Sequence, residues 1–521
     1  MLTKMLVLLC ALSAVTCLSL CLGDCPKRCV CDSSKEVQCY RITSVPRAIP
    51  RDTRKVHLGR NNIKQLRVSD FNGLTRLEDL VLVSCGVEVA EANTFTTLKN
   101  LRTLELWKNK LRNVPGKFPS NLEVLKLGNN RIQNIRETDF EGLTKLKVLE
   151  LQNNRISAIH TGVLSSIYRL ESLVLDGNGL EILIGPLKLA HLKRLSIQNN
   201  KLSSLPSNFF SFLPSLLFLS LSGNAFRKVP QEMPPSLWSL KLDRNMIRVL
   251  RIQDMNYLSH LSELSLSENR LSAANEALAL TNLSIVDLSK NHLKSVPTRF
   301  PSQLRTLDCS HNFIQKLTLK EFTGLCELKH LFLEYNNITF IDPDALQHCL
   351  HLSDLALEQN HLSFFPNGLP DTLIRLDLKG NNIKIICKET VEKLKRLQVL
   401  NLRNNRLSSL NPDLLGYLPR LKRLYLDGNP WNCTCDLMET RMFLTARYLD
   451  IRSGHCATPV HYRGETWISS IKVLNSCGHN SKSGSKGKAI LPNDAKKAQN
   501  NDSLNTNSQT DNEEYYDYDT D

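Results

Sequence analysis

One pattern dominates the 521 residues of this chain: L-x-x-L-x-L-x-x-N-x-L, which occurs seventeen times between Thr53 and Trp431. Its asparagine position falls at residues 61, 85, 109, 130, 154, 178, 200, 224, 245, 269, 291, 312, 336, 360, 381, 405 and 429, so the spacing alternates between about 24 and 21 residues. A unit of this size cannot bury its apolar side alone. The pattern therefore requires a stack of units that share one continuous core.

The stack predicted by this period is a leucine-rich-repeat solenoid, an α/β horseshoe with one short strand per repeat and a parallel β-sheet on its concave face. In the repeat that ends at Asn154, Leu146, Leu149 and Leu151 should point into the core, while the residues between them lie on the opposite side of the strand. A side-chain amide both donates and accepts hydrogen bonds, so each asparagine should point inward and satisfy backbone groups of the turn that leaves the strand.

The segments opposite the strands are expected to be of two kinds. Longer repeats carry sequences such as D-F-E-G-L-T-K-L (Asp139 to Leu146) and E-F-T-G-L-C-E-L (Glu321 to Leu328), which are compatible with a turn of helix. Shorter repeats read V-P-x-x-F-P, V-P-x-x-M-P or F-P-x-x-L-P, and proline favours thin, extended segments there. Strands on one face and slimmer material on the other predict a curved body whose concave face is the binding surface.

The start of the chain predicts secretion. Lys4 precedes an apolar run from Met5 to Leu22, so we expect residues 1–23 to be a signal peptide and the mature protein to be extracellular. A membrane anchor is the less favoured alternative, because the run is barely long enough to span a bilayer. No later segment has eighteen uninterrupted apolar residues, and no other membrane span is predicted.

Two groups of cysteines flank the repeats. They are Cys25, Cys29, Cys31 and Cys39 before the solenoid, and Cys433, Cys435, Cys456 and Cys477 after it. A solenoid has an apolar edge at each end, and small secreted caps cover such edges with disulfides. We therefore expect caps at 24–52 and 432–477, with two disulfides each, around a solenoid at 53–431. Zinc binding is the alternative that the secretory context disfavours.

The other mature cysteines are Cys85, Cys309, Cys326, Cys349 and Cys387, which brings the mature total to an odd thirteen. Cys85 takes an asparagine position and Cys309 an inward apolar position, where a buried thiol acts as a small hydrophobe. Cys326 and Cys349 lie at similar places in adjacent repeats, and whether they form a disulfide is left open. Cys387 is the candidate for a free or intermolecular thiol.

The charge balance is basic. Lys and Arg number 66 against 51 Asp and Glu, and the body is more basic still because the residues after Cys477 carry five Lys against eight acids. Clusters such as Lys193–Arg194 are candidates for binding sulfated polysaccharide, with ordinary solvated surface as the alternative. Nucleic-acid binding is disfavoured by the signal peptide.

Several positions are candidates for modification. Sequons for N-glycosylation occur at Asn282, Asn337, Asn432 and Asn501, and Asn432 lies within the cap. The Ser-Gly pairs lack the acidic neighbourhood expected for a glycosaminoglycan chain, so none is predicted. Residues 478–521 are polar and expected to be disordered, and they end in an acidic segment with Tyr515, Tyr516 and Tyr518.

The cysteine spacing C-x3-C-x-C-x7-C, the secretory context and the alternating repeat length resemble the small leucine-rich proteoglycan family over Cys25 to Cys477. The resemblance implies an extracellular-matrix protein that binds collagen and growth factors of the transforming-growth-factor-β (TGF-β) class. The C-terminal cap is also similar to that of the repeat domains of Slit proteins. The alternative function is therefore a secreted adhesion or guidance ligand that recognises a cell-surface receptor.

Catalysis is not predicted, because the thirteen His residues show no metal-ligand spacing and no nucleophile motif stands at a strand end. No metal and no cofactor are expected. The candidates for partner contact are outward strand positions on the concave face: Arg102, Glu105, Trp107, Lys126, Glu150, Trp238, Lys241, Arg375 and Arg403. The two tryptophans are the most informative, because an exposed aromatic side chain gains little unless a partner covers it.

We expect the terminal tyrosines, Tyr515, Tyr516 or Tyr518, to carry sulfate, because they are surrounded by acidic residues in a secreted, disordered segment. The sulfated tail would act as an anionic arm whose reach shortens as salt reduces the Debye length, about 8 Å at physiological ionic strength. Intact-mass measurement of the secreted protein checks this prediction, and a mass without sulfate increments contradicts it.

Overall fold

The computed structural model describes residues 25–274, 278–447 and 449–478. The predicted signal peptide, the sequon at Asn501 and the acidic end with Tyr515, Tyr516 and Tyr518 lie outside the described residues. Among the described residues, no helix is long and apolar enough to cross a membrane.

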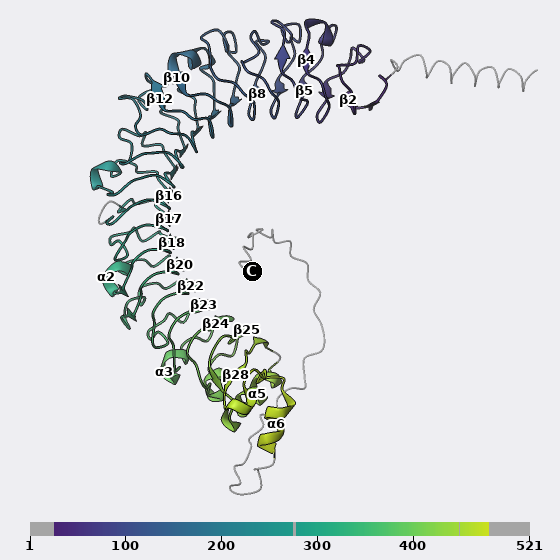
Figure 1. Cartoon of the computed structure of the whole chain (residues 1–521). Helices are drawn as coiled ribbons and strands as arrows, with labels where there is room; N and C mark the ends of the chain where they lie inside the picture. The colour runs from purple at the N-terminus through teal and green to yellow at the C-terminus, as the bar shows by residue number, and fades with distance from the viewer. Residues whose placement is uncertain (1–24, 275–277, 448, 479–521) are drawn as a thin grey trace, which may run out of the picture.

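The chain is a curved solenoid whose inner face carries a sheet with one three-residue strand from each repeat (Figure 1). These strands are β3 (Lys55–His57), β5 (Asp79–Val81), β7 (Thr103–Glu105), β8 (Val124–Lys126), β9 (Val148–Glu150), β11 (Ser172–Val174), β13 (Arg194–Ser196), β14 (Phe218–Ser220), β15 (Ser239–Lys241), β16 (Glu263–Ser265), β17 (Ile285–Asp287), β18 (Thr306–Asp308), β20 (His330–Phe332), β22 (Asp354–Ala356), β23 (Arg375–Asp377), β24 (Val399–Asn401) and β25 (Arg423–Tyr425). Each pairs in parallel with the strand of the next repeat, so the predicted horseshoe is confirmed.

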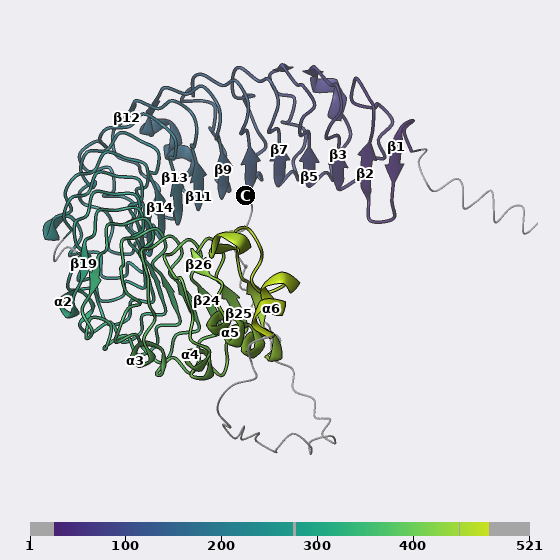
Figure 2. The ribbon, with the colours of Figure 1, turned by 60° about the horizontal axis from the view of Figure 1, so that its bottom comes forward.

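The two caps extend the same sheet. At the N-terminal end, β1 (Cys29–Cys31) pairs antiparallel with β2 (Glu36–Cys39), which is parallel to β3. At the other end, β27 (Asp450–Arg452) is parallel to β25, giving a sheet of 20 strands in the described residues. Figure 2 shows these strands side by side along the inner face of the arc.

The outer part of each repeat is short and irregular. It carries the 3-10 helices η1 (Val68–Phe71), η2 (Thr161–Ile167) and η3 (Ile252–Asp254), the one-turn helices α2 (Leu319–Phe322), α3 (Lys388–Val391) and α4 (Pro412–Gly416), and the parallel strand pairs β4 (Gln65–Leu66) with β6 (Val89–Ala90), β10 (Ala158–His160) with β12 (Ile182–Ile184), and β19 (Lys316–Leu317) with β21 (Phe340–Ile341). Of the two expected helical turns, the one at Glu321 overlaps α2, whereas 139–146 forms only turns. The proline-rich segment from Val114 to Pro119 contains no helix or strand, as expected.

The asparagines form the predicted internal ladder. Asn154 is buried, and its amide Nδ2 donates to the carbonyl oxygens of Leu127, in the preceding repeat, and Leu151, both at 3.0 Å. Its Oδ1 accepts from the backbone N–H of Ile132, also in the preceding repeat, at 3.0 Å. In the one repeat that lacks the asparagine, the buried thiol of Cys85 donates to the Leu58 carbonyl oxygen at 2.8 Å. The ladder thus satisfies buried backbone groups and ties each repeat to the one before it.

The residue before each asparagine position has a positive φ, between 51° and 74°, in all seventeen repeats. This left-handed conformation costs energy for most side chains and is best tolerated by glycine and asparagine, which occupy it at Gly177, Asn153 and Asn404, for example. The chain turns sharply out of the strand at this point. The turn leaves its amide groups without strand partners, and the asparagine side chain supplies the missing hydrogen bonds.

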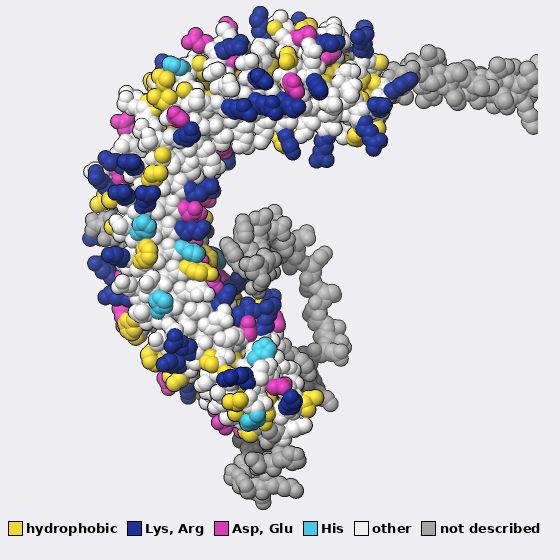
Figure 3. All heavy atoms as spheres, viewed as in Figure 1, with side chains coloured by type: hydrophobic (Ala, Val, Ile, Leu, Met, Phe, Trp, Pro, Cys, Tyr) yellow, Lys and Arg dark blue, Asp and Glu magenta, His cyan; other side chains and the backbone are white. Residues whose placement is uncertain are grey.

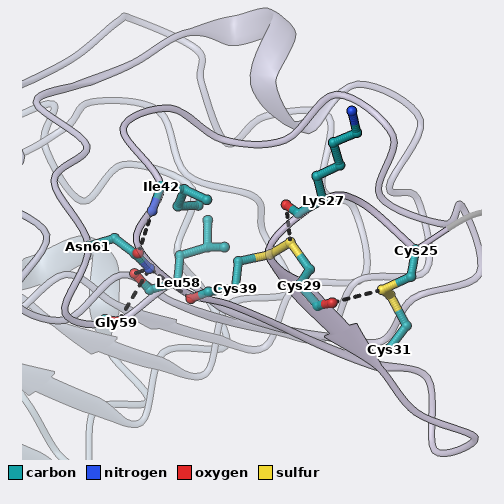
Figure 4. The surroundings of a disulfide bond; sticks show 9 residues. All are labelled: Cys25, Lys27, Cys29, Cys31, Cys39, Ile42, Leu58, Gly59 and Asn61. Carbon is teal, nitrogen blue, oxygen red and sulfur yellow. Dashed lines mark hydrogen bonds between the residues drawn. A yellow bond between two sulfur atoms is a disulfide. The ribbon is translucent and has the colours of Figure 1, made fainter.

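The N-terminal cap is held by disulfides between Cys25 and Cys31 and between Cys29 and Cys39 (Figure 4). The amide of Asn61 joins this cap to the first repeat, because its Nδ2 donates to the Cys39 carbonyl oxygen at 2.9 Å and its Oδ1 accepts from the backbone N–H of Ile42 at 2.9 Å. The cap therefore enters the ladder as if it were a repeat.

The C-terminal cap comprises β26 (Trp431–Asn432), α5 (Cys435–Ala446), β27, β28 (Cys456–Thr458), η4 (Val460–Tyr462) and α6 (Ile471–Gly478). Cys433 is bonded to Cys456, and Cys435 is also in a disulfide. The fully buried rings of Trp431 and Trp467 pack 5.5 Å apart beneath it. Disulfide-bonded caps at both ends are thus confirmed, while the side chain of Cys477 lies outside the description.

The five remaining cysteines of the described residues are free in this structure. Cys85, Cys309 and Cys349 are buried, and burial raises the pKa of the thiols of Cys85 and Cys309, as expected for unreactive small apolar groups. Cys326 and Cys349 do not form a disulfide, and Cys387 is exposed.

The ladder predicts a large difference between two adjacent asparagines. Asn381 is buried, and its side chain makes bonds to Leu362 N–H and to the carbonyl oxygens of Leu357 and Leu378, whereas Asn382 contributes only its backbone. Replacing Asn381 by Ala should lower the free energy of unfolding by about 3 kcal/mol, because buried backbone groups lose their partners. Urea denaturation followed by circular dichroism measures the loss. Asn382→Ala is the control, and equal losses in the two variants would contradict the ladder's role.

Candidate ligand-binding face

The predicted contact residues of the concave face are partly occupied with one another. Lys126 Nζ lies 2.9 Å from Glu105 Oε1 in the adjacent strand, and this hydrogen bond raises the pKa of Lys126. Glu150, in the next strand, accepts a weak hydrogen bond from Gln152 at 3.4 Å. Arg375 pairs with Asp354 at 3.7 Å. These charges compensate each other within the sheet.

The remaining predicted residues differ in exposure. Arg102 and Lys241 are exposed and Trp107 is half-buried. Arg403 was predicted as an outward contact residue, but its side chain is only 11% exposed. Its Nε lies 2.9 Å from Asp427 Oδ1, and its guanidinium group lies 4.6 Å from the centre of the Tyr425 ring. Arg403 is therefore a packed residue of the sheet, because its long side chain folds onto the following strand.

Trp238 belongs to a small aromatic cluster on three adjacent strands. Its ring is 40% exposed and meets the Phe218 ring edge to face, with 5.5 Å between the ring centres. The guanidinium group of Arg194 lies 4.4 Å from the centre of the Phe218 ring. The sequence analysis identified Trp238 but missed Arg194 and Phe218 as its neighbours. Comparing equivalent positions of consecutive repeats would have placed the three together.

A second feature that sequence reasoning missed is a row of acids on four consecutive repeats: Asp308, Glu334, Glu358 and Asp377, here called the acidic row. Burial raises the pKa of all four carboxyl groups, and neighbouring carboxylates contribute to the rise in Asp308, Glu334 and Glu358. The pKa of Glu334 reaches about 8. Its Oε2 is buried and has no hydrogen-bond partner. Glu334 is therefore protonated at neutral pH unless a cation approaches it.

Aromatic and charged side chains border the acidic row. The rings of His311 and Tyr335 stack with their centres 4.3 Å apart and their planes within 6°. His330 Nδ1 lies 3.1 Å from Asp354 Oδ2. Although burial acts to raise it, the pKa of Asp354 is lowered overall by its hydrogen bonds with His330 and Ser353. The row is thus flanked by acids that already have partners, and Glu334 is the acid whose buried oxygen lacks one.

No group of three or more His, Cys, Asp or Glu side chains in the described parts of the chain is arranged to hold a metal ion. Of the sequons, Asn282 is exposed and donates to the Ser259 carbonyl oxygen at 2.6 Å, and Asn337 is exposed beside the ladder residue Asn336. Asn432 is exposed in β26, where its Oδ1 accepts from Thr458 Oγ1 at 2.9 Å. Glycosylation at these positions stays a prediction.

The comparisons with known proteins agree with this architecture. Residues 120–180, 302–362 and 371–430 match the leucine rich repeat family, as do residues 191–213. Mouse nephrocan is 48% identical over 466 residues, which cover 89% of this chain and 91% of nephrocan. The chain belongs to the small leucine-rich proteoglycan family. Mouse podocan is 30% identical, covering 74% of this chain and 58% of podocan, and mouse podocan-like protein 1 is 29% identical, covering 75% and 64%.

Solved structures with the same fold come from several kinds of protein. A leucine-rich-repeat protein of Leptospira interrogans superposes with a TM-score of 0.62 at 26% identity, covering 77% of this chain and 96% of that one. A chain of the octameric complex of Latrophilin 3, Unc5D and FLRT2, in which FLRT2 supplies the leucine-rich repeats, has a TM-score of 0.52 at 28% identity, covering 61% and 97%. This family member therefore shares its solenoid with proteins that assemble with other proteins.

The raised pKa of Glu334 predicts a pH effect on stability. The folded state holds the proton up to about pH 8, whereas the unfolded state releases it near the ordinary pKa of 4.5, so this group's contribution is full below pH 4.5 and is lost as pH rises toward 8. Glu334→Gln should therefore unfold at higher urea than the unchanged protein at pH 8.5 and at nearly the same urea at pH 4.5. The exposed Glu389→Gln is the control, and a Glu334→Gln effect independent of pH would contradict the assignment.

Proposed function

We propose that this protein is a secreted component of the extracellular matrix that binds growth factors of the TGF-β class through its concave face and thereby sequesters or inhibits them. Membership of the small leucine-rich proteoglycan family supports the extracellular setting. The single observation that carries the binding site is the acidic row, in which the buried Oε2 of Glu334 has no partner. A basic side chain of a partner would supply the missing donor.

The physical basis of this recognition is charge complementarity. A lysine or arginine that reaches Glu334 would favour its ionised form and gain a charge-assisted hydrogen bond in a site with little water. Glu358 and Asp377 lie on the following repeats and extend the negative field, so they would steer a basic surface toward the same place. The growth factor is therefore expected to present Lys or Arg side chains to β18–β23.

The aromatic cluster supplies a different kind of contact. Trp238 and Phe218 offer apolar area on the same face, and exposed tryptophans of this type dominate binding energy when a partner buries them. Collagen and sulfated polysaccharide are further proposed partners, with the concave face as the site for collagen. The proposal includes no nucleic acid, metal, cofactor or catalytic reaction.

A second function has support from one comparison. The FLRT2 chain shares the solenoid and is found with Latrophilin 3 and Unc5D in one complex. This likeness favours the alternative of a secreted adhesion or guidance ligand that recognises a cell-surface receptor. Binding of the purified protein to intact cells in the absence of growth factor would favour this alternative.

The proposed function is tested by removing the negative charge of the acidic row. Glu334→Gln combined with Glu358→Gln should weaken binding of TGF-β-class growth factors in surface plasmon resonance by about tenfold or more, since truncating one partner of a buried charge pair costs about 2–5 kcal/mol. Trp238→Ala should weaken it independently. The control is Glu389→Gln combined with Glu392→Gln, which removes the same charge at α3 on the outer side. The proposal is overturned by absent binding in the unchanged protein, or by equal effects of the two double variants.

A further inference from the structure

A cavity of about 350 Å³ opens on the side of the solenoid, in the loops that leave β14, β15 and β16. Five basic side chains line it: Arg227, Lys228, Arg248, Arg251 and Arg270. They come from three consecutive repeats, after the ladder residues Asn224, Asn245 and Asn269. We call this cavity the lateral groove. Figure 3 shows Lys and Arg side chains gathered on the outer edge of this part of the arc.

The five cations have no acidic partners in the described structure. All five are exposed, and none of their side chains takes part in an ion pair or a hydrogen bond. The one acid in the lining, Asp254, is buried and already accepts from the backbone N–H of Arg251 at 2.9 Å and from Gln231 Nε2 at 3.0 Å. The positive charge of the groove is therefore uncompensated by protein groups.

Equivalent positions elsewhere on this side of the solenoid are compensated. Lys110 and Lys201 directly follow ladder asparagines, and each pairs with a glutamate three residues after the preceding ladder position: Glu88 at 3.2 Å and Glu181 at 2.9 Å. Arg270 stands at the same place as these lysines. The residue at the place of the glutamate is Arg248, so the repeat register brings like charges together where other repeats pair opposite ones. Such an arrangement is unfavourable unless an anion joins it.

The shape and lining of the groove specify the kind of anion. Three consecutive repeats extend over roughly 10 Å at the ~4.8 Å spacing of neighbouring strands, so the cations face negative charges that repeat along a chain. Guanidinium groups bind sulfate and phosphate oxygens in pairs. Between the cations lie Met246, 37% exposed, and Val249, 49% exposed, which offer apolar surface to the C–H faces of sugar rings. Sulfated sugars combine these two features and occur outside cells.

We propose that the lateral groove binds a polysulfated polysaccharide chain through Arg227, Lys228, Arg248, Arg251 and Arg270. This inference rests on the extracellular setting of the proposed function, and it is independent of the concave face. It assigns the polysaccharide to the side of the solenoid, so that the sheet stays open to a protein partner.

Heparin is the probe, used with the full-length secreted protein. Arg227→Gln combined with Arg248→Gln should lower heparin affinity at physiological salt by about tenfold or more, and should lower the salt concentration at which the protein elutes from a heparin column. The matched control is Lys110→Gln combined with Lys201→Gln, which removes the same charge from the same side but from cations already paired. The control should bind heparin within about twofold of the unchanged protein.

Four outcomes decide the proposal. Selective loss in the groove variant, with unchanged thermal unfolding, supports it. Equal loss in both variants shows attraction by overall charge alone and overturns it, as does absence of heparin binding in the unchanged protein. Displacement of heparin by a sulfated peptide of residues 511–521 at a lower concentration than heparin itself would instead make the chain's own acidic end the occupant. Growth-factor binding is measured on the same samples, so loss of the concave-face function is distinguished from loss of this site.

Discussion

The hydrogen bonds of the ladder asparagines are the interaction on which the whole structure depends. A single repeat contains too few apolar residues to form a core, and its strand is only three residues long. The amide of Asn154 reaches both its own repeat, at Leu151, and the preceding one, at Leu127 and Ile132. Because the same contacts recur in repeat after repeat, they fix the register between neighbours as well as closing each turn. Positions that are equivalent in sequence are therefore stacked in space, with neighbouring strands about 4.8 Å apart.

This stacking is why the functional features of the molecule are columns and not compact pockets of the usual kind. A column of mixed sign neutralises itself, as in the pairs of Lys126 with Glu105 and of Lys110 with Glu88. A column of one sign stays charged, as in the acidic row of the concave face and the five cations of the lateral groove. In the acidic row the cost is visible in the raised pKa of Glu334, whose proton replaces a missing counterion. Both single-sign columns are thus places where an outside partner of opposite charge would stabilise the protein.

The repeat sequence was sufficient to predict the fold, the inward asparagines and the two caps, because each depends on residues close together in the chain. It was not sufficient to predict which outward residues are free. Arg403 and Lys241 both occupy outward positions on concave strands, yet Arg403 is buried against Tyr425 and Asp427, which belong to the next repeat, whereas Lys241 is exposed. The acidic row was missed for the same reason, since its members are separated by 19 to 26 residues and alternate between two strand positions. Reading down the columns of aligned repeats, in addition to along each repeat, would have indicated both the row and the groove.

The two charged features lie on different surfaces of one rigid solenoid, and this separation has a consequence for how the proposed partners interact. The ladder joins β14–β16, which precede the groove, to β18–β23, which carry the acidic row, through a continuous parallel sheet. A polysaccharide bound at the side would neutralise cations without covering the strands of the concave face. It would also remove positive charge that repels a basic partner, although at physiological salt this influence fades beyond about 8 Å. Binding at the two sites is therefore expected to be nearly additive, so that the matrix polysaccharide sets where the protein is held and the concave face sets which protein it holds.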